Sequence, residues 1–122
     1  MTVTLDSSAW VEYFSGSELG AIVKKYVDES ETIYTSSITL LEIKSKYMRE
    51  GKEWKEQIGF ICDRSAIVDV DSDAALLSAE FRNKYRLHTI DAIIYATSQI
   101  TKTKLVTKDQ DFKDLPDVVM LA

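Results

Sequence analysis

Short runs of β-branched and apolar residues alternate along this chain with longer segments whose apolar residues recur at helical spacing. The short runs predict five strands, at residues 2–6, 32–35, 66–70, 104–106 and 118–120. The longer segments predict helices near residues 10–14, 19–27, 38–49, 54–61, 74–85 and 89–96. Strands that alternate with helices pair in parallel, since each crossover returns the chain to the same end of the sheet. The sequence therefore predicts an α/β fold with a parallel, doubly wound sheet.

Length and composition predict one domain spanning residues 1–122. A chain of 122 residues with 45% hydrophobic residues is long enough for one core and short for two ordinary ones. The single cysteine, Cys62, excludes an internal disulfide framework and fits a reducing compartment. The first residues resemble a strand instead of a signal peptide, and charged residues interrupt every apolar run. We therefore expect a cytoplasmic protein without a membrane partner.

Four acidic residues are predicted to meet at one edge of the sheet. Asp6 ends the first strand, and Asp109 follows the fourth strand by a few residues. Asp91 lies in the first turn of a helix that we expect Thr89 to cap, and Glu42 lies about one turn into its own helix. In a parallel sheet the carboxyl ends of strands and the N-termini of crossover helices share an edge, which is where ligands bind. We expect all four carboxylates to reach one crevice.

A cluster of carboxylates favours bound divalent cations, because the groups otherwise repel one another and raise one another's pKa. Ligands that are all oxygen indicate Mg²⁺ or Mn²⁺. A zinc set is excluded, since His88 and Cys62 are each the only residue of their kind. An ion of this type would polarise a phosphodiester and stabilise a leaving alkoxide. Hydrolysis of a phosphodiester is therefore the predicted chemistry.

Each acid also has a structural interpretation. Asp6, Asp91 and Asp109 all lie near predicted helix starts, where Asp is favoured as a cap or by the helix dipole. Glu42 has no capping role, because it lies within an apolar helical segment where an unpaired Glu is rare. Asp111 is interpreted either as an additional ligand or as a solvated residue of a first turn, and we expect it to be peripheral.

The same residues resemble the motifs of PIN-domain nucleases. The matching segments are Asp6-Ser-Ser-Ala-Trp10, Leu41-Glu42-Ile43, Thr89-Ile-Asp91-Ala-Ile-Ile-Tyr-Ala96 and Leu105-Val-Thr107-Lys-Asp109-Gln-Asp111-Phe112. They span the chain, and its size is most similar to the VapC-type toxins of toxin–antitoxin pairs. The resemblance implies a three-layer α/β/α sandwich with a mostly parallel sheet of strand order 3-2-1-4-5.

The resemblance also implies a function. It implies an endoribonuclease that requires Mg²⁺ or Mn²⁺, acts on an RNA substrate, forms a homodimer and is inhibited by a cognate antitoxin protein. Its metal-binding and catalytic acids would be Asp6, Glu42, Asp91 and Asp109. Ser7 and Thr107 would orient carboxylates or water, and Asp111 occupies a position at which the family varies.

The charge of the chain bears on a nucleic-acid partner. The net charge of −5, from 15 basic and 20 acidic residues, argues against such a partner. Five acids at one site, however, would leave the rest of the chain balanced, and bound cations would reverse the local sign. Two basic strips are candidate RNA tracks, although a solvated face is the favoured interpretation; they comprise Lys44, Lys46, Arg49, Lys52 and Lys55, and Arg82, Lys84 and Arg86.

Several other interpretations remain open. The acidic residues Asp69, Asp71 and Asp73 resemble a calcium loop, but Ala74 stands where such a loop needs Gly. His88 is either a general acid or base or a solvent-facing residue before a helix. Two other functional classes fit a domain of this size, a phosphoacceptor receiver domain and a non-catalytic binding module with the PIN fold.

Overall fold

The computed structural model describes all 122 residues and contains five strands, six α-helices and one 3₁₀ helix. The strands are β1 (Thr2–Leu5), β2 (Thr32–Ser36), β3 (Ala66–Val68), β4 (Lys104–Thr107) and β5 (Val118–Met120). The helices are α1 (Ser7–Ser15), α2 (Glu18–Glu29), α3 (Ser37–Arg49), α4 (Lys55–Arg64), α5 (Ser72–Tyr85) and α6 (Thr89–Ile100), and the 3₁₀ helix is η1 (Gln110–Phe112).

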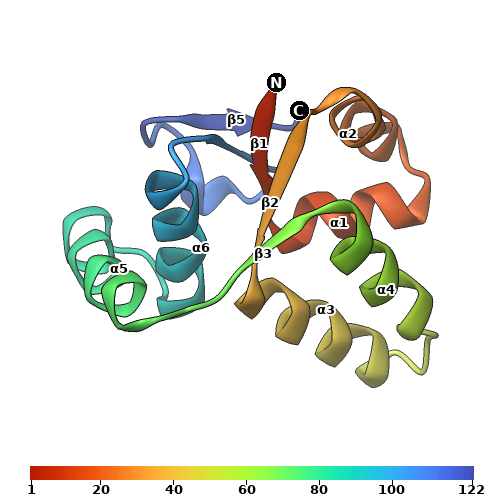
Figure 1. Cartoon of the computed structure of the whole chain (residues 1–122), viewed down its shortest axis with the longest axis horizontal. Coiled ribbons are helices and arrows are strands. Elements are labelled where there is room, and N and C mark those ends of the chain that lie inside the picture. The colour runs from red at the N-terminus through yellow and green to blue at the C-terminus, as the bar shows by residue number, and fades with distance from the viewer.

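The strands form one fully parallel sheet in the order β3-β2-β1-β4-β5. Helices α5 and α6 lie on one side of the sheet, and α1, α2 and α4 lie on the other (Figure 1). Helix α3 lies below the carboxyl ends of the strands and contacts both α1 and α6. The predicted three-layer α/β/α sandwich and its strand order are therefore confirmed.

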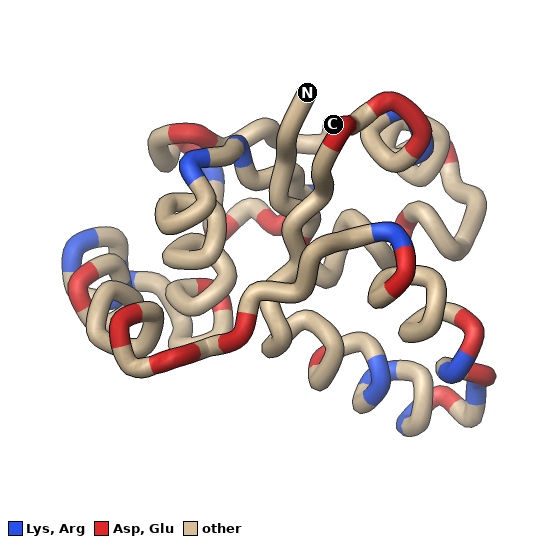
Figure 2. Tube along the Cα trace, viewed as in Figure 1, with Lys and Arg blue, Asp and Glu red and all other residues tan.

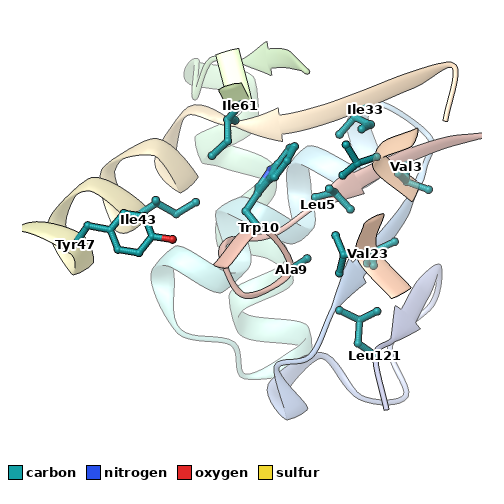
Figure 3. Packing of buried hydrophobic residues seen from close by; sticks show 12 residues of the cluster. Val3, Leu5, Ala9, Trp10, Val23, Ile33, Ile43, Tyr47, Ile61 and Leu121 are labelled. Atoms are coloured by element: carbon teal, nitrogen blue, oxygen red, sulfur yellow. The ribbon is translucent and has the colours of Figure 1, made fainter. Parts of the chain in front are cut away.

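The larger of two hydrophobic clusters centres on Trp10 of α1, whose side chain is fully buried. Trp10 lies between Leu5 of β1 on one side and Ile43 and Ile61 of α3 and α4 on the other (Figure 3). Its indole N–H donates a hydrogen bond of 3.1 Å to Thr35 Oγ1, so the buried polar atom of this large ring is satisfied. The cluster thereby fixes α1, which begins directly after Asp6, against the sheet.

The second cluster fixes α6 on the opposite side of the sheet. Tyr95 of α6 and Phe112 of η1 are almost completely buried in it. The Tyr95 hydroxyl donates a 2.8 Å hydrogen bond to the carbonyl of Pro116, which precedes β5. This packing holds the first turn of α6 and the segment after β4 in one layer.

Two details of the sequence prediction are wrong. His88, not Thr89, is the N-cap of α6, and it makes no side-chain capping bond. Leu76, which the apolar spacing of residues 74–85 places on the core side, is 70% exposed, and Leu41, an apolar residue of α3, is 57% exposed. The reason is the register of each helix, since α3 buries Thr39, Ile43 and Tyr47 and α5 buries the small residues Ala74 and Ser78.

Two smaller predictions have different outcomes. Ser36 and Ser37 precede the third helical segment, and the sequence allows either of them to cap it; Ser36 does cap α3, by accepting from the Ile38 amide. The third strand ends at Val68 instead of residue 70, and Asp71 of the calcium-like segment caps α5 by accepting from the Ala74 amide at 2.9 Å. No helix combines the length and the apolar character needed to cross a bilayer.

Candidate metal centre

Asp6 follows β1 and is the N-cap of α1, where its carboxylate is only 3% exposed. It accepts hydrogen bonds from the Ala9 amide at 2.9 Å, from Ser8 Oγ at 2.7 Å and from Thr107 Oγ1. Burial raises the pKa of Asp6 to about 6, although these three hydrogen bonds lower it. Asp6 is therefore both a structural cap and a poorly solvated carboxylate at the edge of the sheet.

Three further carboxylates converge beside this position. One oxygen from each of Asp91, Asp109 and Asp111 lies within 4.8 Å of the others. Asp91 lies in the first turn of α6. Asp109 caps η1 by accepting from the Asp111 amide at 2.9 Å, while its own amide donates to Thr107 Oγ1 at 2.9 Å. The short turn after β4 thus presents two carboxylates to α6.

The electrostatics of Asp91 show how closely these acids interact. Burial first, and then the negative charges of Asp109, Asp111 and Glu42, raise the pKa of Asp91 to about 7, while His88 lowers it. Asp109 likewise contributes to the raised pKa of Asp6. The five acids therefore share one field of uncompensated negative charge.

Glu42 projects from α3 and is half-buried. Its Oε1 accepts a 2.5 Å hydrogen bond from Ser7 Oγ, in the first residue of α1. Helix α3 lies at the carboxyl end of the sheet. The bond therefore holds Glu42 next to the strand edge that carries Asp6. Ser7 and Thr107 each hold a different carboxylate by a direct hydrogen bond.

The arrangement of these acids differs in one respect from the expectation. Asp111, expected to be peripheral, belongs to the tightest group, whereas Asp6 and Glu42 flank that group. The 3₁₀ turn explains this, because it places Asp111 two residues after Asp109 with its amide bonded back to the Asp109 carboxylate. The Asp-Gln-Asp spacing directly after β4 is the sequence signal for that geometry.

The donor set fits a hard divalent cation. The three converging side chains offer only carboxylate oxygens, which suit Mg²⁺ or Mn²⁺. Besides burial, the negative charges of Asp109, Asp111 and Glu42 raise the pKa of Asp91, and a bound cation would offset these charges. Cys62 is exposed on α4 and belongs to no such group, so thiolate ligation is not offered here.

Similar chains of known structure carry the same fold. A toxin–antitoxin complex from Klebsiella pneumoniae contains a chain that is 25% identical, with 98% of each chain covered and a TM-score of 0.81. VapBC2 from Rickettsia felis, bound to a DNA fragment from its promoter, is 19% identical, with 98% of this chain and 97% of that chain covered and a TM-score of 0.76. VapC20 from Mycobacterium tuberculosis, a sarcin-ricin loop cleaving toxin, is 15% identical, with 95% and 96% covered and a TM-score of 0.75.

Sequence comparison gives the family. No curated protein sequence matches this chain. The sequence profile of the PIN domain, however, matches residues 3–118, which includes every acid of the candidate centre. This chain belongs to the PIN domain family.

Proposed function

We propose that this protein is a metal-dependent endoribonuclease and the toxin component of a toxin–antitoxin pair. The observation that carries the proposal is the convergence of Asp91, Asp109 and Asp111 at the carboxyl edge of a PIN-family sheet. Asp91, Asp109 and Asp111, with Asp6 and Glu42 beside them, would hold Mg²⁺ or Mn²⁺. When bound there, the cation would polarise the scissile phosphodiester and stabilise the leaving alkoxide.

The residues around the acids have positioning roles in this proposal. Thr107 donates to Asp6 and accepts from the Asp109 amide, so one hydroxyl sets the relative position of two acids. Ser7 orients Glu42 from α1. Asp91, with a pKa near 7, takes up a proton close to neutral pH when no cation is present. His88 lowers the pKa of Asp91, and it is not needed as a proton donor where a bound cation supplies the chemistry.

The partners follow from the similar structures. The chains from Klebsiella pneumoniae and Rickettsia felis belong to toxin–antitoxin assemblies, and the Mycobacterium tuberculosis toxin cleaves the sarcin-ricin loop. By analogy, we propose an RNA substrate and a cognate antitoxin for this chain, and the resemblance to VapC-type toxins is the basis for proposing a homodimer. The receiver-domain alternative is not supported, since the strand order here differs from the 2-1-3-4-5 order of flavodoxin-like sheets.

The proposal is tested by incubating the purified protein with RNA in Mg²⁺, in Mn²⁺ and in EDTA. Cleavage is expected with either ion and not in EDTA. Asp91→Asn and Asp109→Asn are expected to lower the rate by at least about 100-fold, as removal of a group that stabilises developing charge does. Asp63→Asn removes an exposed acid on α4 and is the matched control, with an unchanged rate.

Two outcomes would contradict the proposal. One is undiminished cleavage by both Asp91→Asn and Asp109→Asn, which would place the chemistry elsewhere. The other is that the wild-type protein cuts no RNA with either ion while it still binds a partner protein, which would favour the non-catalytic binding module.

A further inference from the structure

We propose that a cavity beside Glu42 is a subsite for a backbone phosphate of the RNA, next to the phosphodiester that is cut. The cavity has a volume of about 320 Å³ and is lined by Ser7, Ser8, Glu42, Lys46, Arg49 and Lys108, among others. This inference rests on the proposed ribonuclease function. It adds the residues that would hold the substrate at a site whose own charge repels it.

The position of the cavity connects it with the candidate metal centre. Glu42 and Ser7, which are hydrogen-bonded to each other, form part of its wall. The charge of Glu42 also acts on Asp91. Glu42 therefore both lines the cavity and acts on Asp91 of the metal centre, so an RNA strand bound at the metal centre can extend to the cavity.

Three cations line the cavity, and they come from two separate parts of the chain. Lys108 follows β4; its amide donates to Ser8 Oγ at 3.1 Å, and its ammonium group is paired with Glu12 of α1. These contacts fix the backbone and the side chain of Lys108 at the rim. In the sequence, Lys108 lies between two motif residues and far from either basic strip, so its position there does not indicate a role in binding phosphate.

The other two cations lie on α3 and differ in their pairing. Lys46 forms an ion pair of 2.5 Å with Glu50. Arg49 donates a 2.9 Å hydrogen bond to the hydroxyl of Ser45 and takes part in no ion pair. Arg49 is therefore the one cation of the cavity without an ion-pair partner, and its guanidinium group is available to bind an anion.

The remaining lysines of the first basic strip have other contacts. Lys44 lies 4.1 Å from the centroid of the Trp54 ring, and Lys55 lies 5.9 Å from it. Lys52 is paired with Glu50 at 3.1 Å. None of these three lines the cavity. Figure 2 shows an acidic position in the first half of α3, followed by basic positions toward its end. Of the first basic strip, only Lys46 and Arg49 therefore line the cavity.

The chemistry of the lining favours a phosphate. A guanidinium group binds phosphate oxygens with two parallel hydrogen bonds, and ammonium and hydroxyl groups add single contacts. Each phosphate that is neutralised releases counterions, which gives affinity that depends on salt but not on sequence. Such a term is needed here, because a carboxylate cluster by itself repels a polyanion.

The test measures binding of a labelled single-stranded RNA oligonucleotide to the Asp91→Asn protein in Mg²⁺, by fluorescence anisotropy at several salt concentrations. Arg49→Gln is expected to weaken binding about 3- to 10-fold and to reduce the slope of log K against log salt by about 0.7, the value for one contact to a single strand. Arg49→Lys should recover part of the affinity, since it restores the charge without the fork.

Lys25→Gln on α2 is the matched control, because it removes one exposed, unpaired cation and changes the net charge equally. Equal effects of Arg49→Gln and Lys25→Gln would overturn the subsite, as would the absence of measurable RNA binding. In the cleavage-competent protein, Arg49→Gln should raise KM and leave kcat within about 2-fold. The two proposals fail separately: a wild-type protein that cuts no RNA but binds it through Arg49 retains the subsite and loses the nuclease.

Discussion

Thr107 makes the most consequential contacts of any single uncharged residue at this centre. It is completely buried, donates to the Asp6 carboxylate and accepts from the Asp109 amide. Its hydrogen bond lowers the pKa of Asp6 against the larger effect of burial. One hydroxyl thus helps to keep Asp6 ionised and fixes the turn that carries Asp109.

We predict that Thr107→Val, which preserves shape but removes the hydroxyl, destabilises the protein by about 1–3 kcal/mol. It should also lower RNA cleavage, because Asp6 and Asp109 lose their common partner. Thr107→Ser should restore both properties, since it keeps the hydroxyl. Urea denaturation and cleavage rates measure the two effects. A Val variant as stable and as active as the wild type would show that the hydroxyl has no positioning role.

The raised pKa values of Asp6 and Asp91 predict how stability depends on pH in the absence of metal. In the unfolded chain both carboxyls ionise above a pH of about 4. In the folded protein Asp6 stays protonated up to a pH of about 6 and Asp91 up to a pH of about 7. The folded state therefore binds more protons, and the free energy of unfolding falls as pH rises through this range.

The melting temperature in EDTA should consequently be higher at pH 5 than at pH 8. Asp91→Asn should weaken this dependence, because one of the two titrating groups is gone, and saturating Mg²⁺ should raise stability mainly at the alkaline end. Thermal denaturation across the pH range measures the effect. A metal-free protein that becomes more stable from pH 5 to pH 8 would contradict the raised pKa values.

At the scale of elements, the contact between α1 and α2 determines where the first residues of α1 lie. Gly20 permits this contact, since a Cβ atom there would lie 2.1 Å from the backbone carbonyl oxygen of Glu12. Backbone atoms cannot move aside as a flexible side chain can. Any larger residue at position 20 therefore forces the two helices apart.

Gly20→Ala should destabilise the protein by about 1–3 kcal/mol, the usual cost of overpacking. Gly59→Ala, in the middle of α4, is its matched control, because no atom beyond its chain neighbours and its own helix backbone lies within 4 Å of the added Cβ. It should instead stabilise the protein by about 0.5–1 kcal/mol, through the higher helix propensity of Ala. Chemical denaturation measures the free energy of unfolding of both variants. If the two substitutions changed it in the same direction, the role given to Gly20 would be contradicted.

The elements could largely be predicted from the sequence because strand and helix periodicities alternate clearly. Which face of each helix is buried was harder to predict. Leu41 and Leu76 have the apolar character of core residues, yet the helices bury Thr39 and Ser78 instead. Close packing between helices selects small or well-shaped residues, and hydrophobicity alone does not indicate which side faces a neighbour.

The acids of the site were predictable for a different reason. Parallel topology brings Asp6, Asp91 and Asp109 to one edge whatever the details of packing. The position of Asp111 depended on the 3₁₀ turn after β4, for which the Asp-Gln-Asp spacing is the only sequence signal. Lys108 likewise acquired significance only through its contacts with Ser8 and Glu12, which are distant in the sequence.

At the scale of the whole molecule, the fold gathers negative charge that the rest of the surface does not balance. The chain carries a net charge of −5, and five of its acids lie at or beside one edge of the sheet. Folding brings these charges together, so a cation that binds only the folded protein stabilises it.

We therefore predict that Mg²⁺ or Mn²⁺ raises the melting temperature in a manner that saturates with concentration. At about 100 times the dissociation constant, the gain is about 2.7 kcal/mol. The shift should be lost in Asp109→Asn and retained in Asp63→Asn, and scanning fluorimetry measures both. A shift of equal size in the two variants would place the bound ion outside this centre.

The most direct test of the central claim is the anomalous diffraction of a crystal soaked in Mn²⁺. The account predicts a manganese peak coordinated by carboxylate oxygens of Asp91, Asp109 and Asp111, with Asp6 and Glu42 beside it. A saturating soak that shows manganese only elsewhere on the molecule, or none at all, would contradict it.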